Sequence, residues 1–101
     1  MDRRSEINRA LTRVIVKRRE DAGLSQEAVW TAAGYRKTPY RDREQNKVHW
    51  GIEDLIRVAE VLRTRAYLLL KEAEEIAAIP PGPDPNRATD ELGAALGFGF
   101  E

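Results

Sequence analysis

Apolar residues recur at helical spacing over the first part of the chain. They are Ile7, Leu11, Val14, Ile15 and Ala22. This pattern predicts an amphipathic helix over residues 5–21, with one face turned toward a core. Ser5 is a suitable N-cap for this helix, and Gly23 is suited to end it. Arg3 and Arg4 precede the helix as a short basic arm that could touch phosphate, although a frayed terminus is the simpler interpretation.

A second, shorter helix is predicted over residues 26–33. Ser25 precedes it, and a serine hydroxyl at this position accepts a hydrogen bond from a free N–H of the first turn. The small and apolar residues on or near one face are Ala28, Val29, Ala32 and Ala33. Gly34 follows, and glycine commonly takes the left-handed conformation with which a helix ends.

The segment after Gly34 is basic and contains a proline. Proline is best tolerated in the first helical turn, and the residue before it avoids the helical conformation. We therefore expect Thr38 to cap a third helix that begins at Pro39 and runs to about Asn46, after a turn over residues 34–37. Two short helices joined in this way form a helix-turn-helix, whose second helix can enter a DNA groove.

A fourth helix is predicted over residues 52–62. Its expected inner stripe consists of Ile52, Leu55, Ile56, Ala59 and Leu62. Neither glycine nor proline occurs between Ile52 and Ile79, so two arrangements are open. In the first, which we favour, Thr64 caps a fifth helix over residues 65–78. In the second, one long fused helix favours a swapped dimer.

The chain changes character at residues 79–86, which hold four of its five prolines and are predicted to form a linker. We therefore expect a domain over residues 1–79 and a linker with a tail over residues 80–101. Thr89 could cap a short helix in this tail. The apolar tail residues are Leu92, Ala95, Leu96, Phe98 and Phe100. The tail could be disordered, pack on the domain or dock on a second subunit, and we predict a homodimer to which it contributes contacts.

Several short motifs occur together between residues 7 and 70. They are A-G-L-S-Q-E at 22–27, A-G-Y at 33–35, Glu44, Lys47 and I-E-D-L-I-R-V-A-E-V-L at 52–62. In these motifs the chain resembles the lambda-repressor-like (XRE-type, Cro/cI-type) helix-turn-helix DNA-binding family, over roughly two thirds of its length. The resemblance implies an all-α, five-helix domain. It also implies an ion pair between Arg19 and Glu44 and places Gln26, Lys47 and His49 near DNA phosphates.

Several residues differ from the usual pattern of that family, among them Pro39 within the recognition segment and Arg63 in place of a glycine. Trp30 replaces a small alanine, Tyr40 and Arg43 replace two aliphatic residues, and Trp50 takes a position often held by proline. We expect Trp30 to be structural and to push the two short helices apart, or alternatively to be a surface anchor for a partner. Arg43 is expected to bury only its methylene stem. Trp50 is expected to pack against the core.

Formal net charge is zero, but the charge is unevenly distributed. Residues 1–19 carry +5 and residues 35–50 carry +3, whereas residues 20–34 carry −3. Residues 51–79 carry −2 and residues 80–101 carry −3. Positive charge therefore collects on the first helix and on the predicted recognition segment, although solvated helix faces would explain part of it.

These features predict a sequence-specific transcriptional regulator, such as a phage-type repressor or an antitoxin-like autoregulator, whose partner is double-stranded DNA. Gln26 and Lys47 are the candidate phosphate contacts. The candidates for base edges are Arg36, Lys37, Thr38, Arg41, Asp42 and Gln45. The alternative function is a protein-interaction module that keeps the fold and has lost DNA binding.

An enzyme is not predicted, because the sequence offers no nucleophile–base constellation and no phosphate-binding glycine loop. The chain has no cysteine and one histidine, His49, so we expect no metal, no catalytic residues and no cofactor. No apolar run approaches the length of a membrane span, and the first ten residues lack the apolar region of a signal peptide. We therefore expect a cytoplasmic protein without a membrane partner.

Overall fold

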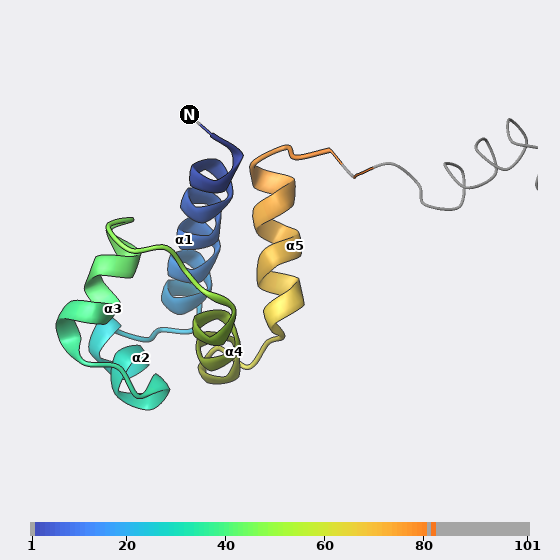
Figure 1. The fold of residues 1–101 in the computed structure, drawn as a ribbon. Helices are drawn as coiled ribbons and strands as arrows, with labels where there is room; N and C mark the ends of the chain where they lie inside the picture. The colour runs from blue at the N-terminus through green and yellow to red at the C-terminus, as the bar shows by residue number, and fades with distance from the viewer. Residues whose placement is uncertain (1, 81, 83–101) are drawn as a thin grey trace, which may run out of the picture.

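The residues described by the computed structural model, 2–80 and 82, form five α-helices and no strand. The helices are α1 (Arg3–Asp21), α2 (Gln26–Ala33), α3 (Lys37–Glu44), α4 (Ile52–Val61) and α5 (Ala66–Ile76). Figure 1 shows α1 and α5 side by side and running in opposite directions, with α4 across one end of the pair. The short helices α2 and α3 lie on the other side of α1 from α5. The all-α prediction is confirmed for these residues.

Helix α1 begins two residues before its predicted start. Asp2, not Ser5, is the N-cap, and its carboxylate accepts a hydrogen bond of 2.8 Å from the Ser5 N–H. This bond holds the pKa of Asp2 below its ordinary value. Aspartate and serine are equally good N-caps, so the upstream aspartate starts the helix two residues earlier than predicted. Arg3 and Arg4 are therefore helical rather than a separate arm.

The bounds of α2 agree with the prediction. The Ser25 hydroxyl accepts from the Ala28 N–H at 3.0 Å, and Gly34 ends the helix with a left-handed φ of 82°.

Helix α3 begins earlier than predicted, because Arg36 rather than Thr38 is its N-cap and Pro39 is the third helical residue. The first backbone hydrogen bond of α3 runs from Tyr40 to Arg36. Pro39 therefore still lies in the first turn, where its missing N–H breaks no bond.

Helices α4 and α5 are separated by a break, as favoured above, and are not fused. The break contains Arg63 in the left-handed conformation with a φ of 56°. The Thr64 N–H returns to the Ala59 carbonyl at 2.9 Å, which closes the end of α4. Arg65 rather than Thr64 is the N-cap of α5.

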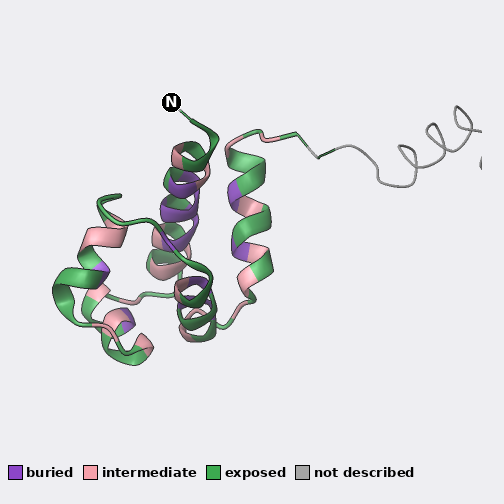
Figure 2. Ribbon diagram, viewed as in Figure 1, coloured by how far each residue is buried: buried purple, intermediate pink, exposed green. Residues whose placement is uncertain are grey.

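The core is formed by the facing sides of all five helices, and the buried segments of α1 and α5 face one another in Figure 2. The buried apolar residues are Ala10, Leu11, Val14, Ile15, Val29, Tyr40, Trp50, Leu55, Val58, Ala59, Leu69 and Ala73. The predicted inner stripe of α4 is partly wrong, because Ile52 is 80% exposed and Ile56 is 54% exposed. Helix α4 is rotated so that Val58 faces the core in their place.

The predicted tail helix after Thr89 and the apolar tail residues lie outside the described residues. No helix in the described part of the chain combines the length and the apolar character that crossing a bilayer requires.

Candidate nucleic-acid interface

The outer face of α3 carries most of the residues predicted to read DNA. Thr38, Arg41 and Gln45 are exposed and follow one another at three- and four-residue spacing, so they share one side of the helix. Arg36 and Lys37 are exposed at its start. The structure thus brings these five candidates together on the surface.

The remaining three candidates lie at the edges of this face. Asp42 is half-buried, and its backbone carbonyl accepts the Lys47 N–H at 2.8 Å, which holds the loop after α3 against the end of the helix. Lys47 itself is exposed. Gln26 is half-buried at the start of α2, and its side chain turns toward α3.

The inner face of α3 is held by a buried carboxylate. Glu44, whose side chain is 4% exposed, pairs with Arg19 of α1 through two hydrogen bonds of 3.0 and 3.2 Å. The predicted Arg19–Glu44 ion pair is confirmed. Glu44 also accepts from the Gln26 amide at 2.9 Å and from the Tyr40 hydroxyl. One carboxylate therefore joins α1, α2 and α3, and Arg19 extends the network by donating to the Leu24 carbonyl at 3.0 Å.

Tyr40 is fully buried at the centre of an aromatic cluster. Its ring centroid lies 6.3 Å from that of Trp30, 5.8 Å from that of Tyr35 and 6.0 Å from that of Trp50, all at tilted or edge-on angles. Burial, with the hydrogen bond to Glu44, raises the pKa of the Tyr40 hydroxyl well above its ordinary value. Trp30 is half-buried and packs against this cluster, which agrees with the expected structural role.

A second network joins α3 to the start of α4. Arg43 Nε lies 3.0 Å from Asp54 Oδ2 but is not aligned for a hydrogen bond, so the contact is an ion pair. The Arg43 Nη1 group donates to the Pro39 carbonyl at 2.8 Å, and the guanidinium carbon lies 5.3 Å from the Tyr35 ring centroid. The prediction that Arg43 buries only its methylene stem is therefore wrong.

Asp54 accepts hydrogen bonds from the Tyr35 hydroxyl and, at 2.7 Å, from the Gly51 N–H. Burial opposes the ionisation of Asp54, but these two bonds and the Arg43 charge outweigh it and hold the pKa of Asp54 below its ordinary 3.8. Burial and the bond to Asp54 raise the pKa of Tyr35. The network fixes Asp54 as a carboxylate at neutral pH.

The loop after α3 is tied to α1 by side chains rather than by backbone pairing. Asn46 has a left-handed φ of 62°, and its side-chain oxygen accepts from Thr12 at 2.7 Å and from Asn8 at 3.4 Å. The buried Trp50 donates its indole N–H to Thr12 and its backbone N–H to Asn8, each at 2.9 Å. The predicted packing of Trp50 is confirmed. Both ends of the loop are thus anchored, while His49 between them is exposed.

The surface that α3 and this loop present is positively charged. Among the described residues, Arg36, Lys37, Arg41 and Lys47 form no ion pair with a carboxylate, so their charges face solvent. Arg43, in contrast, is neutralised by Asp54. Long cationic side chains beside a fixed helix can contact phosphates and base edges. Within the same described range, no cluster of three or more metal-ligating side chains occurs.

Apart from Arg19 and Glu44, the residues that hold α3 in place were not predicted from the sequence. Tyr40 was noted only as a departure from an aliphatic pattern, and Arg43 was expected to bury only its methylene stem. A polar or aromatic residue in place of an aliphatic one signals a buried partner, and here these partners are Glu44 and Asp54.

Comparisons of the chain with protein-family models, with curated proteins and with solved structures gave no match.

Proposed function

We propose that this protein is a sequence-specific DNA-binding transcriptional regulator, with α2 and α3 as a lambda-repressor-like helix-turn-helix. The observation that carries the proposal is the difference between the two faces of α3. Glu44 and Asp54 fix its inner face, whereas its outer face presents polar side chains at Thr38, Arg41 and Gln45. The major groove admits one α-helix, and each base pair there displays a distinct pattern of donors and acceptors.

Arg41 is the strongest candidate for reading a base. Arginine forms paired hydrogen bonds with the O6 and N7 atoms of guanine, and Gln45 on the same face can pair with the edge of adenine. Lys47 would contact a phosphate. Gln26 can do so as well, because one N–H of its amide bonds Glu44 and the second remains available. The free N–H groups at the start of α2 favour a phosphate beside it.

Binding titrations at several salt concentrations test this function. Labelled duplexes from the region around the protein's own gene, together with scrambled duplexes of equal length, serve as ligands for fluorescence anisotropy. Arg41→Ala should weaken the best duplex by about 1–3 kcal/mol and the scrambled duplex much less. Lys47→Ala should weaken both similarly and reduce the slope of log affinity against log salt by about one.

Lys71→Ala is the matched control, because it removes one positive charge from the exposed side of α5, away from α3. It should leave the specific affinity unchanged. Equal losses on both duplexes for Arg41→Ala would reject Arg41 as a base reader. No binding by the unsubstituted protein at low salt would reject the proposed function as a whole.

A protein-interaction module on the same fold is the second candidate. The observation that favours it is the exposure of Ile52 and Ile56 on α4, at 80% and 54%. Two large aliphatic side chains four residues apart lie on one side of a helix, which is the arrangement that helix-binding partners recognise. A folded protein that binds no DNA would favour this function.

A further inference from the structure

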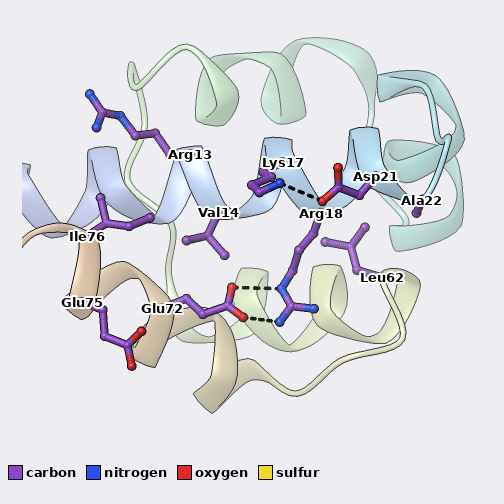
Figure 3. A pocket seen from close by; sticks show the side chains of 10 residues that line it. All are labelled: Arg13, Val14, Lys17, Arg18, Asp21, Ala22, Leu62, Glu72, Glu75 and Ile76. Atoms are coloured by element: carbon purple, nitrogen blue, oxygen red, sulfur yellow. Dashed lines mark hydrogen bonds and ion pairs between the residues drawn. The ribbon is translucent and has the colours of Figure 1, made fainter.

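A groove lies between α1 and α5, on the side of the molecule away from α3. Its volume is about 1000 Å³, at the upper end of the range for small-molecule sites. Figure 3 shows Val14, Leu62 and Ile76 around it, with the Arg18–Glu72 pair joining the two helices. Ile76, on the last turn of α5, is 49% exposed.

The charged residues of this groove are mostly paired with one another. Arg18 pairs with Glu72, where Nε donates to Oε2 at 3.1 Å, and Lys17 pairs with Asp21 at 3.1 Å. Arg13 on the α1 wall and Glu75 on the α5 wall have no ion-pair partner among the described residues. The groove therefore presents an apolar floor with one free basic and one free acidic side chain.

We propose that this groove is the docking site of the chain's own C-terminal segment, residues 87–101. Leu92, Ala95 and Leu96 follow a helical i, i+3, i+4 spacing, which suits a short helix lying in an apolar groove. The segment also carries a partner for each of the two unpaired charges of the groove. Arg87 can pair with Glu75, and the acidic residues next to Leu92 can pair with Arg13.

The position of the segment along the chain favours docking within one molecule. Helix α5 ends at Ile76, on the groove, and only residues 77–86 separate it from the segment. The chain from Pro80 to Leu92 spans up to ~40 Å when extended. Helix α5, with eleven residues, is only ~16 Å long, so the chain can reverse and reach the whole groove.

A tethered segment also has a large concentration advantage over a second molecule. A short linker gives an effective concentration in the range of ~1 mM, provided that it can span the distance. The sequence places Pro81 and Gly82, a dipeptide typical of tight turns, between α5 and the segment, where a reversal of the chain is needed. The sequence-based prediction assigned this tail to a dimer interface, and the groove offers it a surface on its own domain.

A nitroxide label tests the proposal in the full-length chain. Because the protein has no cysteine, Ala94→Cys introduces a single labelling position, within the segment but off the apolar stripe of Leu92, Ala95 and Leu96. In the NMR spectrum, the label should broaden the methyl signals of Val14, Leu62 and Ile76. The signal of Ile52, on the exposed side of α4, should stay sharp.

Two isoleucine-to-serine substitutions, one in the groove and one outside it, test whether the broadening depends on the groove. Ile76→Ser in the labelled protein should abolish the broadening at Val14 and Leu62, whereas Ile52→Ser should preserve it. Both positions are exposed, at 49% and 80%, so neither change removes a buried core residue. Circular dichroism melting curves verify that both variants are folded. Leu96→Ser makes the corresponding change in the segment. Broadening of the groove signals that persists in both Ile76→Ser and Leu96→Ser would overturn the proposal.

A mixing experiment separates the chain's own groove from that of a second copy. Isotope-labelled protein without the nitroxide is mixed with nitroxide-labelled protein that carries no isotope label and therefore gives no signal in the spectrum. Docking within one chain predicts no broadening in this mixture and full broadening in the directly labelled sample. Broadening in the mixture would assign the segment to a second copy and overturn the proposal. Absence of broadening in both samples would overturn it as well. Neither readout involves DNA, so the result is independent of the proposed function.

Discussion

Replacement of Glu44 by alanine should be among the most destabilising single changes in this protein. The side chains of Glu44 and Arg19 are only 4% and 13% exposed, so their pair is buried rather than a surface contact. Removal of one partner of a buried pair costs about 3–5 kcal/mol, because the other charge remains buried without compensation. Here the Tyr40 hydroxyl, inside a fully buried side chain, loses its acceptor as well.

The expected loss is large compared with the total stability of a small domain, about 5–15 kcal/mol. Arg19 retains one bond, to the Leu24 carbonyl, which sets the expectation for Glu44→Ala near the lower end of the range, at about 3 kcal/mol. Glu44→Gln keeps the shape but turns one acceptor into a donor that faces other donors, so it should also destabilise. Tyr40→Phe removes one bond to a charged group and should cost about 1.5 kcal/mol.

Urea unfolding, followed by far-ultraviolet circular dichroism, measures these losses. Lys17→Ala is the control, because it removes one partner of an ion pair on α1 whose side chains are 77% and 66% exposed. That change should cost no more than about 0.5 kcal/mol. A double-mutant cycle of Arg19→Ala and Glu44→Ala should give a coupling free energy within about 0.5–3 kcal/mol. A loss for Glu44→Ala no larger than that for Lys17→Ala would refute the reasoning.

Three further predictions concern the turn, the pH dependence and the loop. Gly34→Ala should destabilise by about 1–2 kcal/mol in urea unfolding, because φ is 82°, whereas Gly51→Ala, at a φ of −90°, should cost less than half as much. Equal costs would contradict this explanation. The pKa of Asp54 is lowered in the folded state, so its stabilisation is present above 3.8 and is lost as the pH falls through the lowered pKa. Asp54→Asn should therefore destabilise the protein at pH 7 and flatten the fall of its unfolding free energy below pH 4. Urea unfolding at several pH values measures this dependence. The same fall below pH 4 in the variant would exclude Asp54 as its source. Trp50→Phe removes the indole N–H bond to Thr12 and should cost at least about 1 kcal/mol, whereas a neutral result in thermal melts would show that the bond contributes nothing.

The parts of the fold that the sequence predicted well are those set by local chemistry. Helix α2 has the predicted bounds because Ser25 caps it and Gly34 adopts the left-handed conformation that few other residues tolerate. The Arg19–Glu44 contact was predicted from a family resemblance, not from spacing. Helix α3 was predicted two residues too late, over 39–46 instead of 37–44, because Pro39 was assigned to the first helical position, although the third position loses no backbone bond either.

The errors in the prediction arise where packing decides between similar local patterns. In α4, Ile52, Leu55 and Ile56 form a good apolar stripe, and so do Leu55, Val58 and Ala59. Hydrophobicity alone cannot choose between the two stripes, because they overlap on the helix surface. The Asp54 network fixes the rotation of α4 by bonding its first turn to Tyr35 and Arg43, and long-range polar contacts of this kind leave no periodic signal.

The aromatic cluster around Tyr40 gives the protein an intrinsic optical probe. Trp30 and Trp50 are its only tryptophans, and both ring centroids lie within 6.3 Å of the ring of Tyr40 on α3. Their emission therefore depends on the position of α3 rather than averaging over the whole molecule. A shift of this helix on loss of Glu44 or on contact with a nucleic acid can be followed in unlabelled protein. Because the Trp50 indole N–H also donates to Thr12, the emission of Trp50 reports on the contact with α1 as well, whereas Trp30 lies within α2.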